Sequence, residues 1–344
     1  MILALQRLVA IMLPSLLIVA CTTSSPVSTF SASEKVWPAA PQQARIAFVT
    51  EFSDIADLGI RPSMWESFLN LTAGADDNRM VRQMAVVATS DAQIIFVADP
   101  DANCIHRYDL LKSRYRCLGA EDGGAVRAVG LTIIDDEWLV ASDSSRGILL
   151  KGRVQGKTLE PFYASQDLEQ PTGVYWNKRT KRLYVADTGQ QSLLEFDENG
   201  SLKRKIGMRG SASGQFNFPT YVWADSRDEV LVTDSLNFRL QRFDRDGQFL
   251  STFGENGDLP GDFARPKGVA TDGFGHVYVI DALMHMLQVF SRDGELLMSV
   301  GSQGNGDGEF WLPNGIFITP DNTIFVADSY NRRVQVFRYV GPES

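Results

Sequence analysis

The chain has 344 residues, 44% of them hydrophobic, which is enough material for one large folded domain or two ordinary ones. Its formal net charge is −9, and no run of Lys or Arg is long enough to follow a phosphate backbone, so the composition argues against nucleic acid as a partner. The 29 glycines and the many short Val/Ile/Phe/Tyr runs favour turns and strands, so we expect an all-β protein.

The first 20 residues differ from the rest of the chain. One basic residue, Arg7, precedes an apolar run that ends in small residues before Cys21, which is the pattern of a signal peptide. Residues 18–21, Ile-Val-Ala-Cys, resemble the lipobox of bacterial lipoproteins, and this resemblance implies cleavage before Cys21 and lipid on its thiol. Because Thr rather than Asp follows Cys21, we expect the outer membrane rather than the inner one. An ordinary secreted protein cut at a nearby small residue and an uncleaved anchor are the alternatives.

Two segments near the N-terminus lack any repeat pattern. Residues 21–43 are rich in Ser, Thr, Pro and Ala and are expected to form a flexible tether. Within residues 53–80, Ser63 and Glu66 have the spacing of a capping box and precede an apolar helical face that includes Trp65. This partly helical insertion is expected either to cover an edge of the fold or to dock a partner or the membrane surface.

Cys104 and Cys117 are the two cysteines left once Cys21 is lipidated. In an exported protein such a pair favours a disulfide. A hairpin that turns at Leu110 and Leu111 places Cys104 opposite Cys117, at a separation that a cross-strand bridge can span. Two buried free thiols are the alternative, because one sequence does not establish the register.

A repeat runs through the remainder of the chain. Six short apolar runs each end in an aspartate, with spacings of 44, 44, 47, 47 and 47 residues: Asp99, Asp143, Asp187, Asp234, Asp281 and Asp328. The Gly-rich pattern GxxGxxxGxFxxP starts at Gly207, Gly254 and Gly301 in the same register. Units of this length with four short strands each are typical of propeller blades, so six units predict a six-bladed β-propeller over residues 44–340, followed by a tail, 341–344.

The last unit has no fourth strand of its own. Residues 44–52 alternate in the way that strand requires, so we expect the N-terminal strand to join the last blade and close the ring.

The Gly-rich stretch and the core "VADSYNRRVQVF" make the chain similar to NHL-repeat propellers of the TolB-like type. The Asp-x-x-Asn-x-Arg pattern is complete in units four and six: Asp234, Asn237 and Arg239, then Asp328, Asn331 and Arg333. A residue that recurs once per blade is expected to be architectural, and the recurring Phe216, Phe263 and Phe310 are expected to pack between blades.

Function is expected where the repeat varies, at the mouth of the central channel. The positions after each blade-opening Pro, with Arg127 or Ala128 as rough equivalents in unit two, and one nearby aromatic residue form a candidate binding rim: Thr172, Thr220, Lys267, Asn314 and Trp311. A solvated rim without a ligand is the alternative.

Enzymatic function finds little support in the sequence. His106, His276 and His285 fall at different places in their units, so no catalytic residue, cofactor or metal ligand is assigned. We therefore expect a lipid-anchored, noncatalytic scaffold of the bacterial cell envelope, a monomer or part of a hetero-complex, that binds an envelope protein or polysaccharide. The alternative is a metal-dependent lyase or lactone hydrolase, for which resemblance to relatives implies Zn or Ca.

Overall fold

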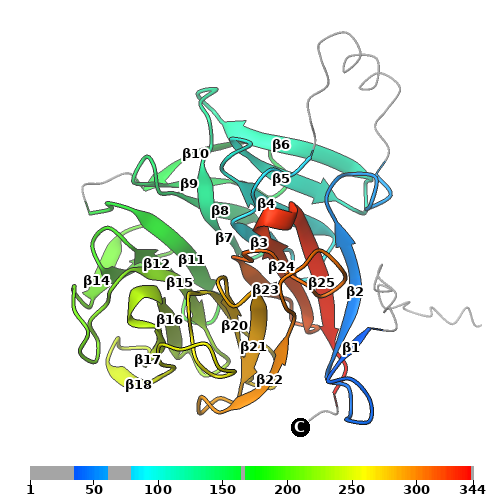
Figure 1. The fold of residues 1–344 in the computed structure, drawn as a ribbon. Coiled ribbons are helices and arrows are strands. Elements are labelled where there is room, and N and C mark those ends of the chain that lie inside the picture. Colours follow the sequence, from blue (N-terminus) through cyan, green and yellow to red (C-terminus); the bar gives the residue numbers. More distant parts are fainter. Residues whose placement is uncertain (1–34, 61–78, 164–166, 342–344) are drawn as a thin grey trace, which may run out of the picture.

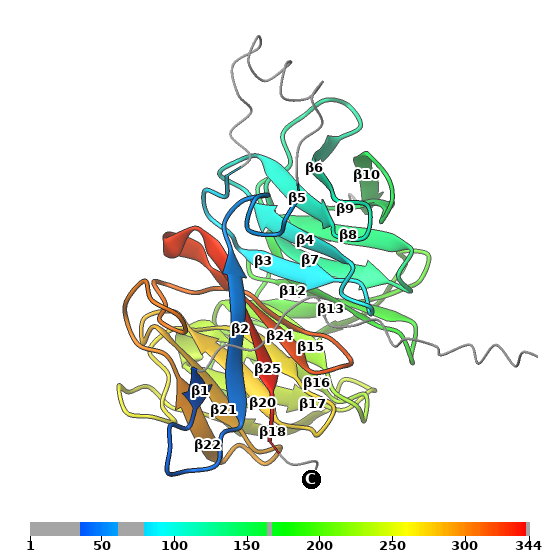
Figure 2. The same cartoon turned by 90° about the vertical axis from the view of Figure 1, so that its right-hand side faces the viewer.

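The computed structural model describes residues 35–60, 79–163 and 167–341. Its strands form six blades around a central axis, as Figures 1 and 2 show. The expected six-bladed, all-β propeller is thereby confirmed. Blades 1 and 2 contain β3 (Ala85–Ala88), β4 (Ile94–Asp99), β5 (Cys104–Asp109) and β6 (Arg114–Ala120), then β7 (Ala128–Ile134), β8 (Trp138–Asp143), β9 (Ile148–Arg153) and β10 (Thr158–Tyr163).

The next three blades are separate four-stranded antiparallel sheets. Blade 3 contains β11 (Pro171–Asn177), β12 (Arg182–Asp187), β13 (Ser192–Asp197) and β14 (Leu202–Ile206). Blade 4 contains β15 (Pro219–Ala224), β16 (Val230–Asp234), β17 (Arg239–Phe243) and β18 (Phe249–Phe253). Blade 5 contains β19 (Pro266–Thr271), β20 (Val277–Asp281), β21 (Met286–Phe290) and β22 (Leu296–Val300).

Blade 6 combines the two ends of the chain, as Figure 2 shows for β2 and β25. It contains β23 (Ile316–Ile318), β24 (Thr323–Asp328) and β25 (Arg333–Tyr339), and β2 (Ile46–Phe52) supplies its fourth strand. Ile46 pairs with Tyr339 and Phe52 with Val334, so the expected closure by the N-terminal strand is confirmed.

A fifth strand extends blade 6 beyond the expected edge. β1 (Val36–Trp37) pairs with β2, and Trp37 packs edge-on against Phe337 with ring centroids 5.9 Å apart. These residues belong to the stretch 21–43 that was expected to be a tether, so this part of it is instead paired with the sheet. Residues 21–34 lie outside the described residues.

Blades 1 and 2 are joined at their outer edges, which the repeat did not predict. β10 pairs with β9 of its own blade and also, in parallel, with β6 of blade 1, so that the two blades form one eight-stranded sheet. The parallel register places Thr158 beside Gly119 and Leu159 beside Ala120. This pairing protects both outer edges from association with other strands.

The Gly-rich loops pack between blades through their phenylalanines. Phe216, Phe263 and Phe310 are fully buried, and each lies near a Phe of the third strand of the following blade. Gly254 has φ +94° and an added Cβ would lie 2.3 Å from the Phe263 ring, so only glycine allows the loop to close over this side chain.

Candidate functional site

The repeated aspartates hold the loops at one end of the propeller. In blade 6, Asp328 accepts hydrogen bonds from the Asn331 amide (2.8 Å), Arg333 Nε (2.9 Å) and the Trp311 backbone N–H (2.8 Å). Arg333 also donates to the carbonyls of Gly306 and Glu309, both at 2.9 Å. Asp234 and Arg239 repeat this arrangement in blade 4, where Arg239 donates to Ala212 and Gln215. The motif therefore clamps the preceding Gly-rich loop, which is an architectural role.

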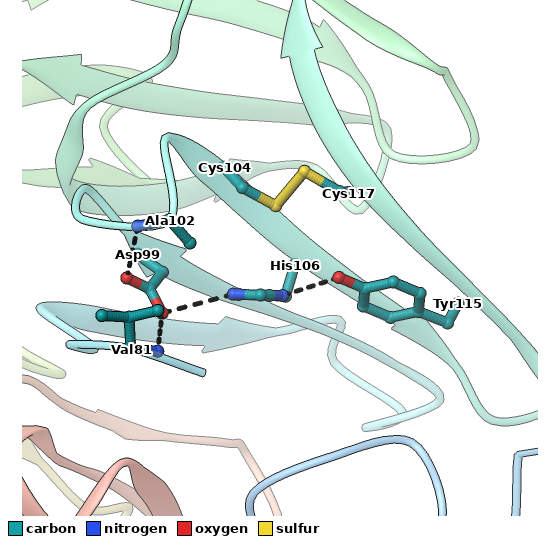
Figure 3. Close-up of a disulfide and its surroundings, with 7 residues drawn as sticks. All are labelled: Val81, Asp99, Ala102, Cys104, His106, Tyr115 and Cys117. Carbon is teal, nitrogen blue, oxygen red and sulfur yellow. Dashed lines mark hydrogen bonds and ion pairs between the residues drawn. A yellow bond between two sulfur atoms is a disulfide. The ribbon is translucent and has the colours of Figure 1, made fainter. Parts of the chain in front are cut away.

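Blade 1 replaces this clamp with other chemistry, drawn in Figure 3. Cys104 and His106 stand where blade 6 has Arg333 and Gln335. Asp99 accepts from the backbone N–H groups of Val81 (2.6 Å) and Ala102 (3.1 Å), and its Oδ2 lies 3.4 Å from His106 Nε2. His106 Nδ1 lies 2.8 Å from Tyr115 Oη. Since His106 is buried and both its nitrogens have partners, we assign it a structural role.

The predicted disulfide between Cys104 and Cys117 is present, with Cα atoms 5.6 Å apart. The predicted register of its hairpin is wrong, because the turn spans residues 110–113 and Asp109 pairs with Arg114. Cys117 is consequently opposite His106, and the bridge runs diagonally between β5 and β6.

Removal of this disulfide is expected to destabilise the protein moderately. The bridge spans 13 residues, and closing a loop of that size in the unfolded chain is worth about 3 kcal/mol. We expect Cys104→Ala/Cys117→Ala to lower the free energy of unfolding by about that amount in urea titrations. Reductant must destabilise the native chain and leave the double variant unchanged; equal effects on both would contradict the assignment.

Six residues at equivalent positions lie at, or just before, the start of the innermost strand of each blade. The pairing of Ala128 with Asp143 makes Val129, rather than Arg127 or Ala128, the equivalent of Thr172 in blade 2. The six are Met84, Val129, Thr172, Thr220, Lys267 and Asn314. We call them the mouth ring, and Lys267 is its one charged member.

Most of the polar mouth-ring residues are engaged in the structure itself. Thr172 Oγ1 lies 2.9 Å from Thr188 Oγ1, and Thr220 Oγ1 lies 2.6 Å from Ser235 Oγ. Asn314 Oδ1 lies 2.7 Å from Tyr221 Oη. Lys267 is half-buried and has no hydrogen bond or ion pair among residues 35–60, 79–163 and 167–341; burial lowers its pKa to about 8.

Aromatic side chains close the channel beneath the mouth ring. Tyr221 reaches from blade 4 to the Met84 carbonyl of blade 1, at 2.6 Å. Trp223 contacts Tyr175 and Phe317, with ring centroids 4.5 and 5.9 Å away. Within the described ranges, the cavity left along the inner strands is about 30 Å³, which is too small for an organic ligand.

Exposed apolar side chains gather at the same end of the molecule, in blades 4 to 6. Leu236, Leu283 and Tyr330 each stand two residues after the blade aspartate, where blades 1 to 3 have Asp101, Ser145 and Gly189. These three side chains are 38%, 53% and 51% exposed. Trp311, which was predicted for the rim, is also exposed, and its ring centroid lies 5.9 Å from that of Tyr330.

Leu236, Leu283 and Tyr330 were not among the predicted site residues, although their sequence pattern contains a signal. The three apolar side chains recur at one position of the repeat, directly after an architectural Asp, in a turn that is polar or glycine in the other blades. We call these three residues with Trp311 the apolar turns. Their backbones belong to the mouth-ring end, because Tyr330 N–H donates to the Trp311 carbonyl and Leu236 N–H to Asn217.

The three histidines lie apart. His106 is in blade 1, His276 follows β19 and His285 follows β20, at opposite ends of blade 5. His285 Nδ1 accepts from the Leu312 backbone N–H at 3.1 Å, and burial lowers the pKa of His285. In the part of the chain that the structure describes, no three His, Cys, Asp or Glu side chains are grouped to hold a metal ion.

Several predicted features lie outside the described residues: the signal peptide of residues 1–20, the lipidation site Cys21, the helix of residues 63–71 and residues 342–344 of the tail. Over the three described ranges, no helix has the length and apolarity needed to span a membrane.

Comparisons with known proteins support the fold. A family model described as a 6-bladed beta-propeller matches residues 167–253 and 269–341. Among solved structures, a virginiamycin B lyase from Staphylococcus aureus is similar at 12% identity and TM-score 0.58, covering 76% of this chain and 97% of that one. An auxiliary nutrient binding protein from Bacteroides thetaiotaomicron VPI-5482 gives 10% identity and TM-score 0.62, covering 77% and 71%.

A third similar structure is the hydrazine synthase of Kuenenia stuttgartiensis, at 12% identity and TM-score 0.54, covering 76% of this chain and 96% of that one. Identities this low establish shared architecture and leave function open. The blades, the closure by β2, the family model and these similar structures agree on one conclusion: the chain is a six-bladed β-propeller.

Proposed function

We propose that this protein is an NHL-type, lipid-anchored, noncatalytic scaffold of the bacterial cell envelope that holds a protein partner at its mouth-ring end. The observation that carries the proposal is the recurrence of exposed apolar residues in the turns of blades 4 to 6. Exposed apolar groups that cluster on one side of a soluble domain are typical of interaction surfaces. Lipid on Cys21 would keep this surface close to the membrane.

Lys267 adds a charged recognition point to the apolar turns. The Lys267 ammonium group is partly removed from water and has no anionic partner among the described residues. A carboxylate of a partner would therefore form an ion pair with it that is weakly screened by water. We therefore expect a partner segment that presents apolar side chains and one acidic residue. The closed channel supports surface binding over uptake of a substrate into the axis.

Two other functions have less support. An envelope polysaccharide would use the Trp311 and Tyr330 rings, but leaves the roles of Leu236 and Leu283 unexplained. For the metal-dependent lyase or lactone hydrolase, no three His, Cys, Asp or Glu side chains are grouped to hold a metal ion within the described ranges.

In-cell crosslinking of the tagged, full-length protein, followed by mass spectrometry, tests the proposal. We expect the double variant Leu283→Ser/Tyr330→Ser to reduce recovery of the partner at least about tenfold. Each of the two substitutions removes about one to two kcal/mol of binding free energy that comes from burial of the apolar side chain. Leu111→Ser is the matched control, since Leu111 is 76% exposed in a turn at the opposite end. Equal recovery of the partner by the native protein, the double variant and Leu111→Ser would contradict the proposal. Recovery of polysaccharide alone would favour a polysaccharide ligand.

The capture should also depend on pH through Lys267. The side chain is an ammonium below its pKa of about 8 and neutral above it, so binding of an acidic partner weakens as pH rises through 8 to 9.5. Lys267→Arg should bind with little pH dependence over this range, because the guanidinium stays charged. Lys267→Gln should bind weakly throughout; an unchanged pH profile in this variant would contradict the role of Lys267.

A further inference from the structure

A groove of about 440 Å³ lies between blades 5 and 6, at the end opposite the mouth ring. Its walls come from three parts of the chain that are far apart in sequence: the strap of residues 38–45 between β1 and β2, blade 5, and the end of β25. Figure 2 shows the strap beside β22. The volume is in the range of sites for small organic ligands.

One end of the groove is polar and basic. An added Cβ on Gly341 would lie 2.5 Å from Tyr339 Oη and 2.8 Å from Arg45 Cδ, so both side chains occupy the space beside this glycine. Arg45 is half-buried and has no ion pair or side-chain hydrogen bond to any residue within the described ranges. An arginine in this position is a ready partner for a carboxylate or sulfonate.

The wall beside this polar end is held rigidly. Asp272 is buried and its Oδ2 lies 2.7 Å from His276 Nδ1 and 2.9 Å from Tyr278 Oη. The His276 ring in turn contacts the Tyr339 ring, with centroids 5.5 Å apart. The Asp272 carboxylate is thus already hydrogen-bonded to His276 and Tyr278. Burial and the nearby Asp272 carboxylate raise the pKa of Tyr278.

The remainder of the groove is apolar. Ile46 and Val289 are buried at its floor, and Leu297 and Met298 of the outer strand β22 line it. Leu297 is 50% exposed although it borders a concave surface. An apolar ligand body placed here would cover exposed hydrocarbon and gain about 25 cal/mol per Å².

The corresponding groove between blades 1 and 2 has different chemistry. It measures about 240 Å³ and is lined by Asp91, Asp109 and Asp136. Its cation, Lys112, lies 3.8 Å from Asp109 Oδ2 and bonds to Gln155. In a repeat protein, a departure from the other units marks a position not required by the shared architecture. Arg45, which has no side-chain partner among the residues that the structure describes, is such a departure.

We propose that the groove between blades 5 and 6 is a second ligand site, which takes a small amphipathic organic anion. The carboxylate or sulfonate of the ligand binds Arg45 and the Tyr339 hydroxyl, and its apolar body lies on Val289, Leu297 and Met298. This site is independent of the mouth ring and of the proposed partner surface, and either can exist without the other.

Titration of the purified protein with 1-anilinonaphthalene-8-sulfonate tests the site by fluorescence. We expect saturable one-site binding that Arg45→Gln weakens about tenfold and Tyr339→Phe severalfold, because each removes one hydrogen-bonded contact to the anion. Met298→Trp, which fills the groove from an outer strand, should abolish binding. Unchanged melting temperatures show that these variants are folded.

The matched control is Lys112→Gln, which removes one positive charge from the groove between blades 1 and 2 and should leave the affinity unchanged. Leu283→Ser/Tyr330→Ser tests whether the dye binds the apolar turns instead. The proposal is overturned if Arg45→Gln and Met298→Trp bind like the native protein, or if the apolar-turn variant alone abolishes binding.

Competition with ligands of equal chain length then tests the required charge. Decanoate should displace the dye, decanol should do so at least about tenfold less well, and decylammonium should not compete, because Arg45 attracts only the first. Equal displacement by all three would show a merely apolar surface and contradict the assignment of Arg45.

Discussion

Arg333→Ala is expected to lower the free energy of unfolding by about 3–5 kcal/mol, the usual cost of removing one partner from a buried ion pair. Arg333 and Asp328 are both buried, with Arg333 Nε 2.9 Å from the carboxylate. Arg333 also bonds to Glu51 of β2 and to the Asn305 carbonyl, so one side chain links the closing strand, the last blade and the Gly-rich loop. Its loss leaves the buried Asp328 carboxylate without its ion-pair partner and removes one hydrogen bond from each carbonyl that Arg333 contacts in the Gly-rich loop.

Urea titrations of Arg333→Ala and Arg332→Ala provide the measurement. Arg332 is the exposed neighbour, so its replacement should change stability by no more than about 0.5 kcal/mol. A decrease of less than about 1 kcal/mol in the free energy of unfolding of Arg333→Ala would contradict the prediction, and would show that water replaces the hydrogen bonds of Arg333. Arg239→Ala in blade 4 should cost less than Arg333→Ala, because Arg239 is more exposed and has no contact with the closing strand.

Removal of residues 1–52 is expected to abolish the cooperative unfolding transition. β2 contributes buried Ile46, Phe48, Val49 and Phe52, and burial of four such side chains is worth about 6–12 kcal/mol, comparable to the whole stability of a domain. Phe48 packs on Phe337 of blade 6, and Phe52 packs on Tyr108 of blade 1, so the strand joins the last blade to the first. Without it, β25 becomes an open edge that favours aggregation.

A circular permutant separates loss of the strand from disturbance of the chain. The Val340 N–H donates to the Arg45 carbonyl at 2.7 Å, so a short glycine linker can join the end of β25 to the start of β2. A protein that begins at residue 53 and ends with the moved residues 45–52 should unfold cooperatively, whereas the truncated protein should not. Calorimetry and gel filtration of both proteins test this; a monomeric, cooperatively melting truncation would contradict the role of β2.

The architecture could be predicted from the sequence because each repeat unit contains the residues that form its own blade. Each unit carries its own apolar strands, and the spacing of Asp328, Asn331 and Arg333 contains the clamp that holds its loop. The missing last strand and the alternation of residues 44–52 were sufficient to predict closure. The pairing of Cys104 with Cys117 was also predictable, because the expected lipidation of Cys21 left these two cysteines for a bridge.

The registers, the blocked channel and the sites could not be predicted, because they depend on contacts between distant parts of the chain. The length of the turn after Asp109 set the hairpin register, and a one-residue offset hid Val129 as a mouth-ring member. The spacing of the sequence repeat and the amino-acid composition do not predict which side chains from different blades contact one another. Tyr221 closes the channel by reaching another blade, and Arg45 meets Tyr339 only because the two ends of the chain share one sheet. Such contacts depend on ring closure, a property of the whole molecule rather than of any single repeat.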